Sequence, residues 1–160
     1  MTTVLERDEL ITDNARPGAI RTVLLATDLT RASDVATDQA IEIAGSLGAR
    51  LLVVHVIDVG RPGGGPIAPY ERVVRIDQRK TPLESALLSI VQRARARHTE
   101  AEFLLWTGEP GQSVVAAAEA EGADLIVVGT RGLDASGQFL LGSISNYVVY
   151  HSSCPVLVAH

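Results

Sequence analysis

Short runs of apolar residues that alternate with helical segments constrain the fold of this chain more than any other feature. The runs cover residues 22–26, 51–56, 101–106, 125–128 and 155–159. Most are apolar at nearly every position, which is typical of strands buried on both faces. Such strands, when helices separate them, form a parallel sheet covered on both faces, with right-handed crossovers. The sequence therefore predicts an α/β domain with three layers.

Helix signals occupy the segments between these strands. We expect a first helix that is capped by Thr30 and ended by Gly48. A second is expected to start at the capping box T-P-L-E of residues 81–84. A third covers about 112–121, and Gly122 ends it.

Two segments lack these patterns. Residues 1–20 are polar and have no sustained apolar period, so we expect a polar N-terminal extension followed by one domain over 21–160. Residues 60–66 are rich in glycine and proline and can be neither helix nor central strand. We therefore expect a loop from there to Lys80.

A glycine-rich stretch follows the run at 125–128 and carries the clearest chemical signal. Gly129 and Gly132 are three residues apart, and Gly142 and Ser143 follow after nine further residues. Glycine lets a ligand approach the main chain, and consecutive free N–H groups bind anions. Ser143 stands where a helix N-cap is expected, and helix N-termini favour phosphate. The spacing favours a phosphate-binding loop over its alternative, a glycine-rich surface turn.

Three segments that are far apart in the sequence end at the same edge of the predicted sheet. Asp28 follows the first strand, Val56 ends the second, and Gly129 ends the fourth. Ligands of open α/β sheets bind beyond the carboxyl ends of the strands, where the strand order reverses. The sequence therefore predicts one crevice to which all three segments contribute.

At these residues the chain resembles the universal stress protein family, specifically its ATP-binding branch. Gly129, Gly132, Gly142 and Ser143 match the family signature G-x2-G-x9-G-[S/T] without an insertion. The segments A-T-D at 26–28, H-V-I-D at 55–58 and C-P-V-L-V at 154–158 are also similar. The resemblance implies a Rossmann-like, adenine nucleotide α-hydrolase-like fold, a three-layer sandwich whose five-stranded parallel sheet has the order 3-2-1-4-5.

The resemblance also implies a set of residues that bind the nucleotide. The set is Ala26, Thr27, Asp28, Val56, Val128, Gly129, Arg131, Gly132, Gly142, Ser143, Ile144 and Ser145. Val56 would meet adenine through its backbone, and the hydroxyls of Ser143 and Ser145 would lie near phosphate or a phosphate-bound metal. Asp28 would accept hydrogen bonds from ribose or adenine, although it could instead cap the next helix or bond a turn N–H. Arg131 could pair with phosphate or be solvated.

One feature departs from many relatives, which carry a basic residue between the second and third glycines. Residues 133–141 contain no lysine or arginine, and Asp134 adds a negative charge. Phosphate would then be compensated by backbone N–H groups, a divalent cation, Arg131, or the basic loop around 72–80. Magnesium needs few protein ligands, because it prefers phosphate oxygens and water. We therefore expect ATP with Mg²⁺ held mainly by the phosphates, and no metal site in the protein.

The sequence offers no catalytic residues. It contains no G-x-x-x-x-G-K-[S/T] loop, kinase motif or G-x-S-x-G elbow, and no residue can be assigned as a general base. We expect an ATP-binding stress-response switch or sensor with little or no hydrolysis. The alternatives are an adenylating or ATP-hydrolysing enzyme of the α-hydrolase-like group, and a sensor of another adenine nucleotide such as cyclic AMP.

Composition limits the partners and the compartment. The net charge is −5 and no basic face stands out, so a nucleic-acid partner is not expected. No signal peptide or membrane span is evident, and Cys154 is the single cysteine. We expect a cytoplasmic protein, with a protein partner that the sequence does not identify. The apolar strand at 156–159 would form a sheet edge, and family members commonly form homodimers through this strand.

Overall fold

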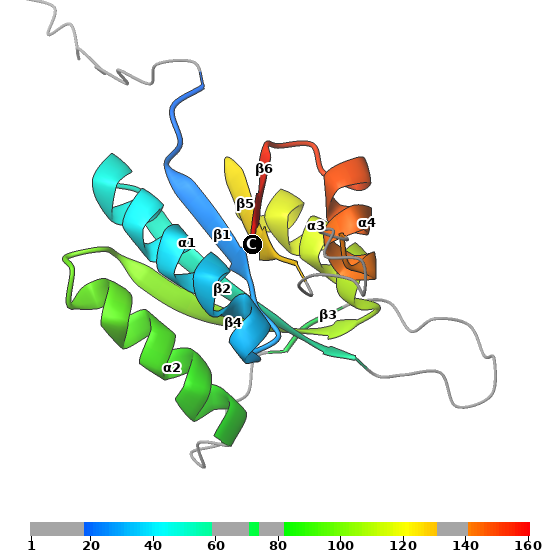
Figure 1. Ribbon diagram of the computed structural model, residues 1–160, viewed down its shortest axis with the longest axis horizontal. Helices are drawn as coiled ribbons and strands as arrows, with labels where there is room; N and C mark the ends of the chain where they lie inside the picture. Colours follow the sequence, from blue (N-terminus) through cyan, green and yellow to red (C-terminus); the bar gives the residue numbers. More distant parts are fainter. Residues whose placement is uncertain (1–17, 59–70, 74–81, 131–140) are drawn as a thin grey trace, which may run out of the picture.

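The computed structural model describes residues 18–58, 71–73, 82–130 and 141–160. The strands and helices form three layers, with the sheet in the middle (Figure 1). The strands are β1 (Thr22–Ala26), β2 (Arg50–Asp58), β3 (Glu71–Val73), β4 (Ala101–Gly108), β5 (Leu125–Gly129) and β6 (Val156–Ala159). The helices are η1 (Arg31–Ser33), α1 (Asp34–Leu47), α2 (Pro82–Arg95), α3 (Pro110–Glu121) and α4 (Ser143–His151).

The sheet confirms the predicted topology. The strand order is β3-β4-β2-β1-β5-β6, and the five strands from β4 to β6 are parallel. Without β3, this is the order 3-2-1-4-5 along the chain. β6 lies at one edge of the sheet, as expected. The order reverses beside β1, so the crevice predicted there lies between the extensions of β1, β2 and β5.

The short strand β3 was not predicted. It runs antiparallel to β4, with Arg72 opposite Trp106, inside the segment that the sequence analysis treats as a loop. Three residues are too few to show a strand periodicity. β3 exists because the long strand β4 offers its free edge, which is a property of the assembled sheet.

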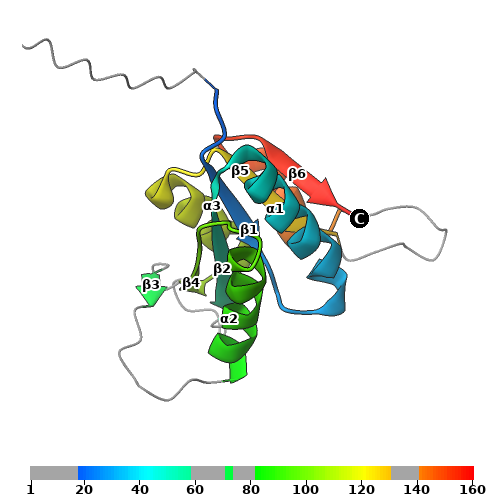
Figure 2. The ribbon, with the colours of Figure 1, turned by 90° about the vertical axis from the view of Figure 1, so that its left-hand side faces the viewer.

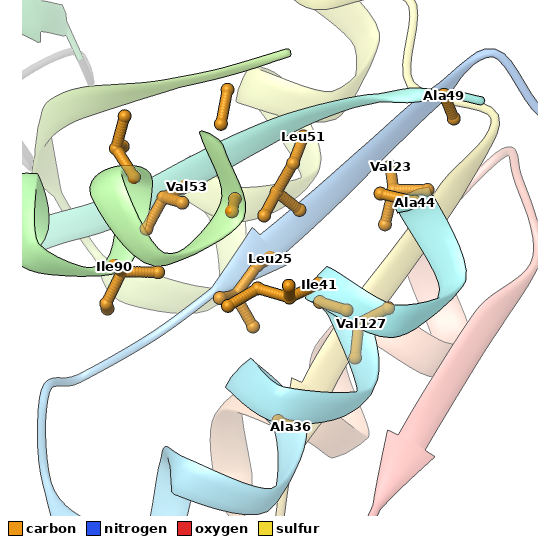
Figure 3. Close-up of a cluster of buried hydrophobic side chains, with 14 of the residues drawn as sticks. Val23, Leu25, Ala36, Ile41, Ala44, Ala49, Leu51, Val53, Ile90 and Val127 are labelled. Atoms are coloured by element: carbon orange, nitrogen blue, oxygen red, sulfur yellow. The ribbon is translucent and has the colours of Figure 1, made fainter. Parts of the chain in front are cut away.

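Each face of the sheet is covered by two helices (Figures 1 and 2). α1 and α2 cover one face and pack on Leu25, Val53 and Val127 in a cluster that Figure 3 shows. α3 and α4 cover the other face and pack on Leu24 and Ile126. All five of these side chains are buried. Successive side chains of a central strand point to opposite faces of the sheet, and each face is covered by a layer of helices.

Some element ends match the sequence and others do not. Gly48 and Gly122 end α1 and α3 in the left-handed conformation that glycine favours, as predicted. Thr30 does not cap α1, because η1 intervenes and the Thr30 hydroxyl donates to Asp28 instead. α3 starts at Pro110, earlier than predicted, since the carboxylate of Glu109 accepts hydrogen bonds from two N–H groups of its first turn. The predicted cap at Thr81 lies outside the described residues.

β2 and β4 are longer than predicted, and this difference shapes the site. The two strands pair as far as Asp58 and Gly108, so each stabilises the end of the other. β1, in contrast, pairs with β2 only as far as Ala26, which lies opposite Val54. The last four residues of β2 therefore extend past the end of β1.

Candidate functional site

A cavity of about 230 Å³ lies at the carboxyl ends of β1, β2 and β5. Its walls come from the turn after β1, the end of β2, the first turns of α3, the end of β5 and the start of α4. Nine of the residues that the sequence analysis selected line it. They are Ala26, Thr27, Asp28, Val56, Val128, Gly129, Gly142, Ile144 and Ser145. Arg131 and Gly132 lie outside the described residues.

Ser143 is not where the sequence analysis placed it. Gly142 is the N-cap of α4, with extended backbone angles, and Ser143 is the first residue of the helix. Ser143 is exposed and is not among the residues that line the cavity. The hydroxyl of Ser145 instead lies in the wall and donates to the carbonyl of Gly142 at 3.0 Å. The helix boundary moves by one residue because Gly142 provides the turn into the helix.

The start of α4 still directs backbone donors to the cavity. The first intrahelical bond runs from the Asn146 N–H to the Gly142 carbonyl at 2.9 Å. The N–H groups of residues 143–145 precede that bond and have no acceptor within the helix. Ile144 and Ser145 are in the cavity wall, so this end of the cavity is suited to an anion.

Val56 presents a free backbone edge on the opposite side. The carbonyl of Val54 faces β1, because it accepts the Thr27 N–H at 3.0 Å. Alternate residues of a strand direct their N–H and C=O groups to the same side, so those of Val56 also face the β1 side. The pairing of β1 with β2 has ended by then, and the structure describes no strand beside Val56 there. One donor and one acceptor at neighbouring positions are therefore open to a ligand.

Asp28 has a structural role that the sequence analysis considered as its alternative. One carboxylate oxygen accepts the Thr30 N–H at 2.9 Å and the Thr30 hydroxyl at 2.7 Å. Partial burial acts to raise the pKa of Asp28, but hydrogen bonds from Thr30 and Ser33 outweigh it and hold the pKa below its ordinary value. Asp28 is therefore a carboxylate at neutral pH. It stabilises the turn and lines the cavity at the same time.

The Thr30 hydroxyl should contribute measurably to the acidity of Asp28. Replacing Thr30 by valine removes one donor, so we expect the pKa of Asp28 to rise, as followed by NMR titration of its carboxyl group. Because the folded-state pKa lies below the unfolded one, Asp28 stabilises the protein above its ordinary pKa of about 3.9 and loses this effect as the pH falls through the folded-state value. The valine variant should lose part of that pH dependence. An unchanged pKa of Asp28 in the valine variant would show that the Thr30 hydroxyl does not help to lower it.

Sequence reasoning did not include several residues of the cavity wall. Pro110 and Val114 are four apart in α3 and share one face of the helix. Asp58 is the last residue of β2, and Thr130 follows β5. The wall also contains His55, whose Nδ1 lies 2.9 Å from the Thr27 carbonyl oxygen. The strand-end residues could have been found from the sequence, because they stand at the ends of predicted strands. Pro110 and Val114 could not, since α3 reaches the cavity wall only because the folded chain places it over β2.

Among the described residues, no three histidine, cysteine, aspartate or glutamate side chains come together as ligands of a metal ion. None of the helices in this part of the chain is both long and apolar enough to span a membrane.

Comparison with known proteins agrees with this geometry. The model of the universal stress protein family matches residues 19–160. The chain belongs to the universal stress protein family. A universal stress protein of Thermus aquaticus is 39% identical over 140 residues, which cover 86% of this chain and 97% of the relative.

Solved universal stress proteins share the fold. One, determined in complex with cAMP, is 28% identical and superposes with a TM-score of 0.66, covering 89% of this chain and 98% of the other. Another, from Archaeoglobus fulgidus in complex with dAMP, is 23% identical with a TM-score of 0.61 and covers 89% of this chain and 99% of the other. The second similarity shows the fold alone.

Proposed function

We propose that this universal stress protein binds an adenine nucleotide in the cavity, with ATP and Mg²⁺ as its principal ligand. The protein would act as a nucleotide-dependent switch or sensor in a stress response, with little or no hydrolysis of ATP. The observation that carries the proposal is the pairing of two backbone features across one cavity. The open edge of Val56 suits a base, and the start of α4 suits phosphate.

The edge of Val56 suits adenine in particular. Adenine presents an amino donor next to a ring-nitrogen acceptor, and the backbone of Val56 offers an acceptor and a donor. Ala26, Val54 and Val128 supply apolar surface in the same wall. The related structure solved in complex with cAMP supports an adenine nucleotide as the ligand.

Mg²⁺ would be held mainly by the phosphates in this proposal, because it prefers phosphate oxygens and water to an all-protein site. Asp28 would accept hydrogen bonds from the nucleoside. Arg131, Gly132 and Ser143 remain part of the proposed site, although the first two lie outside the described residues.

One sample of the purified protein is denatured first, and any nucleotide that it releases is identified. A second, folded sample is then titrated with Mg-ATP by calorimetry, which is the direct test. We expect saturable binding of ATP and no comparable binding of GTP. If the protein binds neither ATP nor another adenine nucleotide at millimolar concentration, the proposed function is wrong.

Recognition through the backbone predicts how variants of Val56 behave. Val56→Ala keeps the N–H and C=O and should change the affinity for ATP less than about threefold. Val56→Pro removes the N–H without removing a bond to β4, since this N–H faces away from β4, and should weaken binding about tenfold. Calorimetry with ATP measures both, and circular dichroism confirms that each variant folds. Equal losses for alanine and proline would show that the side chain, not the backbone, binds the base.

Cyclic AMP is a second candidate ligand, favoured by the complex of the 28% identical relative. Competition between ATP and cAMP separates the two. If cAMP displaces ATP at concentrations far below those at which ATP binds, the protein is a cAMP sensor. A single-turnover assay with labelled ATP addresses catalysis: unchanged nucleotide indicates a sensor, slow release of ADP a hydrolysing switch, and AMP with pyrophosphate an adenylating enzyme.

We also propose that the protein is a cytoplasmic homodimer that pairs through β6. This strand has β5 on one side, and the structure describes no strand on its other side. An apolar strand with an open edge favours pairing with another chain, and a twofold dimer closes it. Sedimentation velocity at micromolar concentration should show a dimer, and Val158→Pro should shift it toward monomer. A wild-type monomer at this concentration would contradict the proposal.

A further inference from the structure

His55 makes a contact that shows which of its ring nitrogens carries a hydrogen. Its Nδ1 lies 2.9 Å from the carbonyl oxygen of Thr27, which can only accept a hydrogen bond. Nδ1 therefore carries the hydrogen and donates it. His55 is half-buried and also lines the cavity. This bond joins the extended end of β2 to the turn that follows β1.

A hydrogen bond to the Thr27 carbonyl affects the position of the next residue, Asp28. It belongs to the peptide group that leads to Asp28, and a peptide group is planar. Holding the carbonyl therefore sets the orientation of the whole plane up to the Cα atom of Asp28. The Thr27 N–H is held as well, by the Val54 carbonyl at 3.0 Å. Thr27 is thus fixed to β2 on both of its backbone sides.

The rest of the turn needs such support. Leu29 has a φ of 63°, in the left-handed region that a leucine rarely adopts and that persists only where its surroundings enforce it. Its N–H donates to the Thr27 hydroxyl at 3.0 Å, and that hydroxyl also pairs with the Ser33 hydroxyl at 3.0 Å. These bonds lie within the turn itself. Within the described residues, the bonds to Val54 and His55 are the ones that tie Thr27 to the neighbouring strand.

We infer that His55 is a positioning residue, which holds the Thr27 carbonyl and thereby orients Asp28 toward the ligand. Histidine acts here through Nδ1, and Nε2 is not needed. The role in ligand binding rests on the proposed function, whereas the effect on the turn does not. Two measurements therefore test the inference, one without nucleotide and one with it.

The first measurement is amide hydrogen exchange of the protein without added nucleotide, in the wild type and in His55→Leu. Leucine fills similar space but donates no hydrogen bond. We expect the N–H groups of Leu29 and Thr30 to exchange about tenfold faster in the variant, because their acceptors belong to Thr27 and Asp28. Amides of the sheet centre, such as that of Leu24, serve as the internal control. Unchanged exchange at Leu29 and Thr30 would overturn the inference.

The second measurement compares the affinity for Mg-ATP among three variants. Asparagine places an N–H where Nδ1 stands, and glutamine places one where Nε2 stands. His55→Asn should bind within about threefold of the wild type, whereas His55→Gln and His55→Leu should bind about tenfold more weakly. Equal losses in all three, or retention by glutamine alone, would overturn the assigned role.

Coupling to Asp28 completes the test. Asp28→Asn should weaken binding in the wild type and in His55→Asn by similar factors, but only slightly in His55→Leu, where Asp28 is already misplaced. Independent losses that multiply would overturn the inference. If the wild type binds no adenine nucleotide, the proposed function falls, and hydrogen exchange alone still decides the role of His55 in the turn.

Discussion

Gly129→Val is expected to weaken the binding of Mg-ATP by about a hundredfold while leaving the protein folded. Gly129 ends β5 directly beneath η1. A Cβ atom added there would lie 3.2 Å from the carbonyl oxygen of Ala32 and 3.5 Å from the Cα atom of Ser33. Both neighbours form part of the cavity wall. Because the close atoms are backbone, they can yield only if η1 moves.

The two further methyl groups of valine make that movement unavoidable. Overpacking of this kind costs about 1–3 kcal/mol of folding free energy. Gly129→Ala should lie between the wild type and the valine variant in affinity, since its single Cβ requires a shift of only a few tenths of an ångström. Calorimetric titration with Mg-ATP measures the series.

A matched control separates lost stability from lost binding. Val127 precedes Gly129 by two residues in β5, is fully buried, and does not line the cavity. Val127→Ala should cost about 2 kcal/mol of stability and leave the affinity for ATP within about threefold of the wild type. If Gly129→Val binds ATP as the wild type does, the wall formed by η1 and β5 does not contact the ligand.

Gly111→Ala is expected to lower the free energy of unfolding by about 2 kcal/mol, which corresponds to a fall in Tm of about 4–8 °C for a chain of this size. An added Cβ atom would lie 2.9 Å from both Cβ and Cγ of Tyr147. These atoms are close to the backbone of α4, so a change of side-chain rotamer cannot move Cβ away. α3 and α4 would have to separate, although alanine is the better helix former.

Ser113→Ala, in the same turn of α3, provides the opposite expectation. The side chain of Ser113 is fully buried, and its hydroxyl has no hydrogen-bond partner within the described part of the structure. Removing an unsatisfied buried hydroxyl should leave the stability unchanged or raise it. Thermal unfolding followed by circular dichroism measures both variants. A stable Gly111→Ala protein would show that the contact between the two helices can relax.

Separation of α3 from α4 should also change the shape of the cavity. Pro110 and Val114 contribute to its wall from α3, and Ile144 and Ser145 contribute from α4. We therefore expect Gly111→Ala to weaken the binding of Mg-ATP, although Gly111 itself is not part of the wall. Ser113→Ala should bind as the wild type does. The packing of two helices is thus expected to set the width of the proposed nucleotide site.

Local patterns were sufficient for the framework of this protein. Continuous apolar runs predicted the buried strands, and Gly48 and Gly122 predicted two helix ends, because these signals depend only on neighbours in the sequence. The order of the parallel strands was implied by the family resemblance and is confirmed. The same signals failed for β3 and for the cap of α1, where an edge of β4 and the acceptor on Asp28 compete with the local pattern.

The sequence by itself thus determined the layered α/β architecture, the family, and the gathering of Asp28, Val56 and Gly129 at one end of the sheet. Only the tertiary structure decided which of their backbone groups and side chains are open to a ligand and which are bonded within the protein. β1 stops four residues before β2 does, which leaves the backbone of Val56 open and brings His55 to the Thr27 carbonyl. The relative lengths of two neighbouring strands depend on what each pairs with on its other side. That information lies in the assembled sheet and in no single segment of the chain.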